Sequence, residues 1–163
     1  MIICLKLILS SLRLCLFAVI LLYNCTTLLS QELPKGAIRI FPESINWGDA
    51  PPSLPAGAKV FILEGNPQQE GIFTMRVKFP PYYKLPAHTH HKDERVTVLE
   101  GAVYVGFGNA MDTANAQRFT VGSYYLNPVN EAHYVFTGEE GVIFQVTGLG
   151  PWGLVYTEEK INK

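Results

Sequence analysis

The sequence predicts an all-β protein, an antiparallel β-barrel or jelly roll of the double-stranded β-helix type. Short runs of β-branched and aromatic residues recur from residue 59 onward, with Gly or Pro between them. Residues 73–79 alternate between apolar and polar side chains, which is typical of a strand with one buried face. Helix signals are scarce over the same region. Many short strands at regular spacing favour a sandwich or barrel.

Residues 1–30 predict a secretory signal peptide that takes no part in the fold. Lys6 and Arg13 are their only charged residues, and an apolar run, 14–22, follows. A basic start before a short apolar run is the layout of a signal peptide. The run is shorter than the roughly 18 residues expected of a membrane span. We therefore expect cleavage after Ser30 and export to the periplasm or beyond.

The cysteines refine this prediction. Cys4, Cys15 and Cys25 all lie in the leader, so cleavage after Ser30 leaves a mature chain without cysteine. Such a chain can enter an oxidising compartment without disulfides and offers no thiolate ligand. Two alternatives remain for the leader. Residues 22–25 weakly resemble a lipobox, which would make Cys25 a lipidated N-terminus, or the leader is an uncleaved membrane anchor.

The charge of the mature chain argues against a nucleic-acid partner. It carries 11 basic and 14 acidic residues, a net charge of −3, with no clustered basic patch. The length of the mature chain suits a single domain with a hydrophobic core.

The mature chain divides into a proline-rich arm, residues 31–58, and a barrel, residues 59–163. Five prolines and three glycines in the arm oppose helices and central strands. Residues 109–117 predict a surface loop or one helical turn. Residues 148–153 predict a glycine-rich turn, with Trp152 packed against the barrel end or, alternatively, touching a ligand. The predicted strands are 59–63, 71–79, 95–99, 102–107, 119–121, 123–126, 133–136, 142–147 and 154–156.

Three histidines within four residues predict a metal site. His88 and His90 are separated by one residue, so on a strand they point to the same face. His91 then points to the other face, and we expect it on the surface. The alternative is that the whole histidine run is a solvated loop.

Glu94 joins this site only if the chain turns before it. Along a straight strand it would lie about 13 Å from His90, at roughly 3.3 Å per residue. A turn over residues 91–93 would bring it back beside the histidines, at the head of an inward face with Val96 and Val98. A buried carboxylate needs a partner, which a divalent cation would supply. Taken alone, Glu94 is more simply a solvated charge.

The order of these residues resembles the two motifs of the cupin superfamily, in particular small exported bacterial cupins with a cupin-2-like barrel. The first motif is two histidines one residue apart, a glutamate three or four residues later and a glycine seven beyond. Here these are His88, His90, Glu94 and Gly101. The resemblance covers roughly residues 59–156.

The second motif is a glycine, a proline and a histidine. Here Gly122, Pro128 and His133 stand at the matching distances. His133 by itself could equally be a core histidine, and its place in this motif favours a ligand.

The sequence departs from the family pattern at three positions. Tyr82 stands where the family has a glycine before the first histidine, Asn130 where it has a glycine in the second motif, and Thr137 where it often has asparagine. Asn is the best substitute for glycine in a turn with positive φ. Thr137 lies outside the ligand set, so only a local contact is in doubt there.

The resemblance implies one metal ion held by His88, His90, Glu94 and His133. Three imidazoles and one carboxylate suit a divalent transition metal, namely Fe, Mn, Zn, Ni or Cu. It also implies a homodimer, in which the arm could cross to the partner barrel, and a small-molecule ligand or substrate. Apart from the N-terminal lipid anchor considered above, no membrane partner is expected.

Three functions are compatible with such a barrel. The first is a metal-dependent enzyme, a dioxygenase, isomerase or lyase, that acts on a small oxygen-rich molecule. The second is a non-catalytic module that binds a small ligand through the metal. The third is a structural barrel that has lost its metal. No catalytic residue is identified, although Tyr104, Tyr124 and Tyr125 are candidates for polar groups in the pocket.

Overall fold

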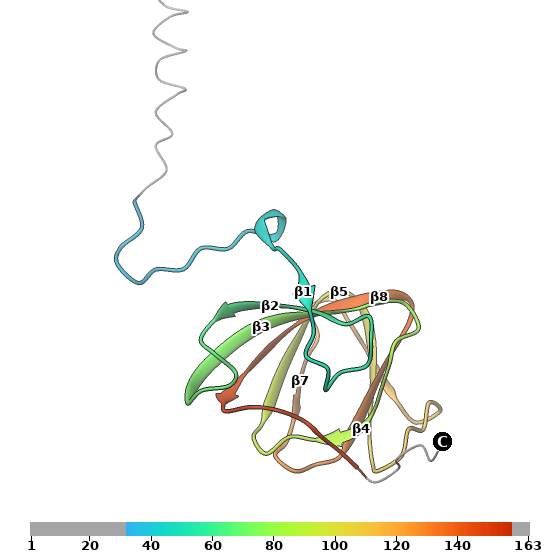
Figure 1. Cartoon of the computed structure of the whole chain (residues 1–163). Coiled ribbons are helices and arrows are strands. Elements are labelled where there is room, and N and C mark those ends of the chain that lie inside the picture. The colour runs from blue at the N-terminus through green and yellow to red at the C-terminus, as the bar shows by residue number, and fades with distance from the viewer. Residues whose placement is uncertain (1–31, 158–163) are drawn as a thin grey trace, which may run out of the picture. The chain divides into compact units, whose positions relative to one another are not determined.

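The computed structural model describes residues 32–157 (Figure 1). The predicted signal peptide and the alternative lipid anchor at Cys25 lie outside the described residues. Within the described range, the chain has no helix of the length and hydropathy needed to cross a bilayer.

The described chain is almost entirely β-structure, as predicted. Its one helical element is the 3₁₀ turn Pro42–Ser44. The strands form one curled antiparallel sheet (Figure 1), which confirms the jelly-roll barrel. They are β1 (Gly48–Asp49), β2 (Lys59–Glu64), β3 (Gly71–Phe79), β4 (Lys84–Thr89), β5 (Glu94–Phe107), β6 (Gln117–Thr120), β7 (Tyr124–Asn127), β8 (His133–Gly150) and β9 (Val155–Tyr156).

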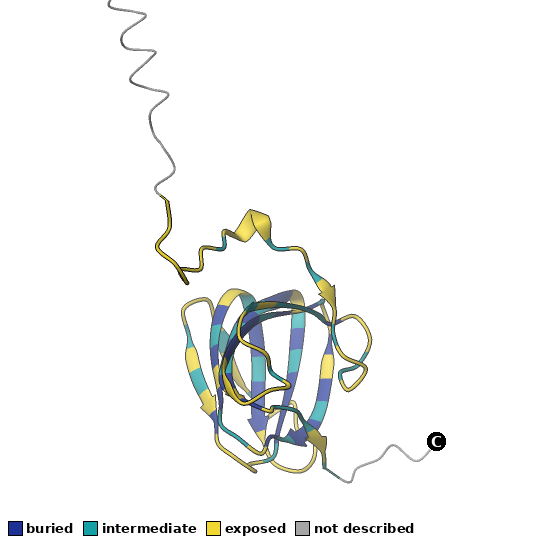
Figure 2. Cartoon of the chain, turned by 60° about the vertical axis from the view of Figure 1, so that its left-hand side comes forward, coloured by how far each residue is buried: buried dark blue, intermediate teal, exposed yellow. Residues whose placement is uncertain are grey.

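The two longest strands, β5 and β8, organise the sheet. One path of neighbours runs β1-β2-β3-β8-β4-β9, and β5 pairs with β6, β7 and β8. Because β8 lies between β3 and β4 and also pairs with β5, it connects every part of the barrel. Figure 2 shows buried residues on these strands and exposed residues mainly in the loops.

The buried faces follow the period-two pattern. On β3 the side chains of Phe73, Met75, Val77 and Phe79 are buried in the core. On β5 the buried face begins with Glu94 and continues through Val96 and Val98. The predicted inward face of each strand is therefore confirmed, and it places the Glu94 carboxylate inside the barrel.

The prediction that β5 and β8 would each be two strands is wrong. Both run through the expected breaks, and their pairing register shifts on either side of Gly101. Gly101 has a φ of 69°, and a Cβ there would collide with the carbonyl oxygen of Gly141. The two strands therefore bend together at a bulge, where the sequence pattern indicated turns.

Three further elements differ from the prediction. β1 lies in the predicted arm, where no strand was expected, and pairs with β2 at the edge of the sheet. β4 was not among the predicted strands. It contains Pro86, which opposes regular strand pairing, and a register shift between Leu85 and His88 accommodates the proline. Residues 148–150 continue β8 and pair with β3, where a turn was predicted. Gly148 lies against the rings of Phe73 and Trp152, so the absence of a side chain there leaves room for their packing.

Candidate metal centre

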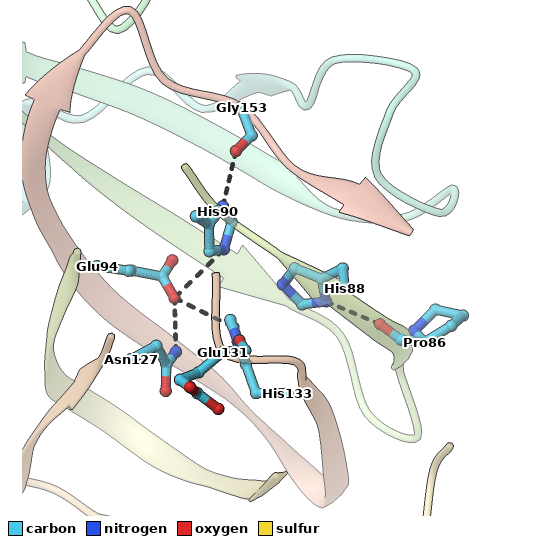
Figure 3. Close-up of polar contacts among 8 residues, drawn as sticks. All are labelled: Pro86, His88, His90, Glu94, Asn127, Glu131, His133 and Gly153. Atoms are coloured by element: carbon cyan, nitrogen blue, oxygen red, sulfur yellow. Dashed lines mark hydrogen bonds and ion pairs between the residues drawn. The ribbon is translucent and has the colours of Figure 1, made fainter. Parts of the chain in front are cut away.

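Strand pairing brings the histidines of the two motifs together. His88 on β4 is the direct neighbour of His133 on β8. His90 follows β4, residues 91–93 turn, and Glu94 opens β5. The turn that the sequence required before Glu94 is therefore present. Figure 3 shows the three imidazole rings and the carboxylate converging inside the barrel.

One ring nitrogen of each histidine is held by a backbone carbonyl. His88 Nδ1 donates to Pro86 O at 2.7 Å, and His90 Nδ1 donates to Gly153 O at 2.8 Å. His133 Nδ1 donates to Glu131 O at 3.1 Å. These bonds fix the ring orientations and leave each Nε2 with its lone pair.

The free nitrogens face one another and Glu94. The three histidines each offer a ligand atom within 4.8 Å of those of the other two. Glu94 Oε2 lies 3.6 Å from His90 Nε2 and 3.5 Å from His133 Nε2. Because all four side chains are buried, water does not easily satisfy these atoms.

The donor atoms fit a metal ion. Within the described chain, His90 Nε2 and His133 Nε2 are buried without a hydrogen-bond partner, which is costly unless something else binds them. A cation among the three imidazoles would satisfy both nitrogens and the adjacent carboxylate. The cluster of His88, His90 and His133 could therefore hold a metal ion.

The electrostatics keep these groups in their ligand forms. Burial, followed by the neighbouring His133, lowers the pKa of His88 from 6.5 to about 3. Burial likewise lowers the pKa of His90. Burial alone would raise the pKa of Glu94, but the nearby His133 and His90 outweigh it and bring that pKa to about 2. At neutral pH His88 and His90 are therefore neutral imidazoles, and the Glu94 carboxylate is ionised.

Two supporting contacts were not foreseen from the sequence, although Trp152 itself was predicted to pack against the barrel end or, alternatively, to touch a ligand. Asn127 is 1% exposed, and its Nδ2 donates to Glu94 Oε2 at 2.7 Å. The Trp152 ring stacks on His90 with centroids 4.3 Å apart and planes 16° apart. Neither relationship has a local sequence signal, because Asn127 reaches Glu94 through pairing of β7 with β5, and Trp152 is far along the chain.

A cavity of about 480 Å³ opens onto the site. His88, His90 and Glu94 form part of its wall, together with Tyr125 and Trp152. The volume lies within the range of small-molecule sites. Of the three tyrosines predicted as pocket groups, only Tyr125 lines this cavity.

Comparison with known proteins identifies the family. The profile of the ChrR cupin-like domain matches residues 35–152. The chain belongs to this cupin family. This cupin is also 36% identical over 69 residues to germin-like protein 8-6 of Oryza sativa subsp. japonica. That match covers 40% of the chain, and the chain spans only about a third, 31%, of the germin-like protein.

Solved structures share the fold of this cupin. A candidate acetylacetone dioxygenase from Methylibium petroleiphilum aligns with a TM-score of 0.58 and 18% identity, over 78% of this chain and 85% of that one. The polyketide cyclase RemF from Streptomyces resistomycificus aligns with a TM-score of 0.56 and 18% identity, over 74% and 87%. At this identity the likeness establishes the barrel alone.

The departures of this cupin from the family motifs are absorbed locally. Tyr82 and Asn130, which stand where the family has glycine, adopt positive φ values of 58° and 64°. Thr137 Oγ1 accepts from the Tyr83 N–H at 2.8 Å and donates to Pro80 O at 2.7 Å. These contacts lie outside the candidate ligands, as predicted.

His91 lies where the sequence placed it. It is exposed, and its Nε2 is 2.8 Å from Pro151 O. It therefore points away from the three clustered histidines.

Proposed function

We propose that this cupin is a metal-dependent enzyme, a dioxygenase, isomerase or lyase, that acts on a small molecule bearing oxygen donors. The observation that carries the proposal is the pair of buried, unpartnered Nε2 atoms of His90 and His133 beside a ligand-sized cavity. His88 is the third proposed ligand, and Glu94 is the fourth. An Fe, Mn, Zn, Ni or Cu ion bound there would supply Lewis acidity, or dioxygen chemistry if redox-active.

The chain's own residues define what a bound molecule would meet. The carbonyl bonds of the histidines hold the rings in place, so the site is organised before substrate binds. Asn127 fixes the Glu94 carboxylate from the side. Burial, and then the Glu94 charge, raise the pKa of Tyr125 well above its ordinary value, so its phenol keeps its proton and can donate it in a hydrogen bond to substrate oxygen.

The open side of the site, toward the cavity, supports catalysis more than simple binding. Catalytic metal sites keep a coordination position open to substrate, and here His88, His90 and Glu94 all border the cavity. Two proteins that share this barrel fold, a candidate dioxygenase and a polyketide cyclase, support the choice of an enzyme. A non-catalytic module that uses the metal to bind a small ligand is the second candidate.

A turnover screen tests the enzyme proposal. Metal-loaded protein is incubated with small diketones, phenolics and sugars, while oxygen consumption is recorded and products are identified by mass spectrometry. We expect turnover of at least one compound, and its loss in His133→Ala. A stoichiometrically metal-loaded protein that converts none of them would favour the binding module. Export and homodimer formation remain separate proposals, decided by the N-terminal mass of the native protein and by light scattering.

A further inference from the structure

The cavity beside the metal centre has walls that select among substrates. Strands β2, β3, β4 and β8 supply about half of its lining residues, and most of the others come from the segments before and after β2 and from the chain after β8. Tyr83 Oη donates to Pro55 O at 2.8 Å, and Tyr156 Oη donates to Ser53 O at 2.7 Å. These bonds hold the segment that carries Leu54 in place, so it forms a fixed wall of the cavity.

The lining is predominantly aliphatic and aromatic. β2 contributes Ile62, β3 contributes Met75 and Val77, and β8 contributes Phe144 and Val146. The polar side chains of the lining are few. They are His88, His90, Glu94, Tyr125, Ser53 and Gln68, apart from the indole of Trp152.

Charge is distributed unevenly in this cavity. No Lys or Arg is among the described residues that line it, and Glu94 is its one acidic residue. A carboxylate, phosphate or sulfonate on the body of a substrate would leave water without gaining a cationic partner, which is unfavourable. A polyhydroxylated sugar would likewise lose water without enough partners along the aliphatic walls.

We infer that the substrate is a neutral, predominantly apolar molecule whose oxygen donors are gathered at one end. That end would meet the metal centre and the Tyr125 phenol, and the hydrocarbon body would fill the space between β2, β3 and β8. This inference rests on the proposed metal site and narrows its substrate class to exclude sugars and molecules with charged bodies.

Alkyl hydroxamic acids test the inference, because they keep one chelating head and vary only in the tail. The probes are aceto-, butano- and hexanohydroxamic acid, titrated calorimetrically into the Co²⁺-loaded mature protein. Burial of a methylene in an apolar cavity tightens binding by about fourfold. We expect Kd to fall by about that factor per methylene along the series. A Kd that does not change with tail length would overturn the inference.

A charged tail provides the matched probe. Monohydroxamic succinic acid has the carbon count of butanohydroxamic acid but ends in a carboxylate. We expect it to bind roughly fivefold more weakly or worse, because that carboxylate finds no cation in the cavity. Equal or tighter binding would also overturn the inference.

A variant pair assigns the effect to the cavity. Ile62→Arg puts a cation into the wall at a residue that is 39% exposed, so folding is expected to survive. We expect Ile62→Arg to weaken the binding of hexanohydroxamic acid and to make the protein bind monohydroxamic succinic acid more tightly than butanohydroxamic acid. Ile72→Arg makes the same change at a position that is 64% exposed and does not line the cavity. It should preserve both affinities within about twofold; a shift equal to that of Ile62→Arg would contradict the assignment.

The two failures are distinguishable. A protein that takes up no Co²⁺, seen as no visible absorption band of the protein-bound ion, contradicts the proposed metal site itself. If the protein binds Co²⁺ but its affinity does not depend on tail length, the metal-site proposal stands and only the inference of an apolar substrate is contradicted.

Discussion

Asn127 Nδ2 donates a 2.7 Å hydrogen bond to Oε2 of Glu94, the same oxygen that faces the Nε2 atoms of His90 and His133. The two residues are cross-strand neighbours on β7 and β5. The carboxylate therefore has a buried amide on one side and the imidazole cluster on the other (Figure 3). This arrangement makes Asn127 a positioning residue for the proposed fourth ligand.

Asn127→Ala should lower metal affinity while leaving the barrel folded. Loss of a partner that orients a metal ligand typically costs about tenfold to a hundredfold in affinity. Competition against a chromophoric chelator measures this directly, with circular dichroism as the check on folding. Asn115→Ala is the matched control, since Asn115 bonds the exposed Asp112. Wild-type affinity in the Asn127 variant would rule out the positioning role.

The metal-free protein should lose stability as the pH falls below about 6.5. His88 has a pKa of about 3 when folded and 6.5 ordinarily, so between these values the unfolded chain binds more protons. Glu94, at about 2 against an ordinary 4.5, adds a further loss below pH 4.5. Both groups act in the same direction, and acidification favours unfolding.

Calorimetry from pH 8 to pH 4, with chelator present, measures this dependence. The melting temperature should be nearly constant above pH 7 and fall steadily below 6.5. His91→Gln should show the same profile as wild type, because His91 is exposed and lies outside the cluster. A melting temperature that rises on acidification would show that the buried imidazoles are protonated in the folded state.

Tyr82→Gly should stabilise the protein by about 1 kcal/mol. Tyr82 has a φ of 58°, which costs a non-glycine residue roughly 1–2 kcal/mol. Its side chain is 67% exposed, so little packing is lost. Denaturant unfolding of the two proteins measures the difference. Tyr124→Gly, at a tyrosine of β7 that is 58% exposed, should instead destabilise. Destabilisation by both changes would mean that the Tyr82 side chain contributes contacts that outweigh its backbone strain.

The fold and the inward positions of His88, His90 and Glu94 followed from local patterns, whereas His133 was added to the predicted ligands only through the resemblance to the second cupin motif. Period-two alternation placed Glu94 inward with Val96, and the spacing of His88 and His90 placed them on one face. The positive φ of Asn130 could likewise be inferred from the turn that its motif requires. The alternation on β5 and the spacing of His88 and His90 depend on residues that are close in sequence.

What the sequence did not reveal depends on cross-strand register and on packing over long separations. Asn127 meets Glu94 only because β7 pairs with β5 in one register. Trp152 stacks on His90 because the chain after β8 returns past the barrel interior. Gly101 was interpreted as the end of a strand, but glycine also occurs at bulges, and here it lies at a bulge within the continuous strand β5.

The most direct test of the account is the metal content of the purified mature protein beside His88→Ala and His91→Ala. Each protein is incubated with iron, manganese, zinc, nickel and copper, desalted and measured by elemental analysis, with circular dichroism confirming the fold. The account predicts about one transition-metal ion per chain in wild type and in His91→Ala, and a loss of most of it in His88→Ala. A wild-type protein that stays metal-free, or equal metal in all three proteins, would contradict it.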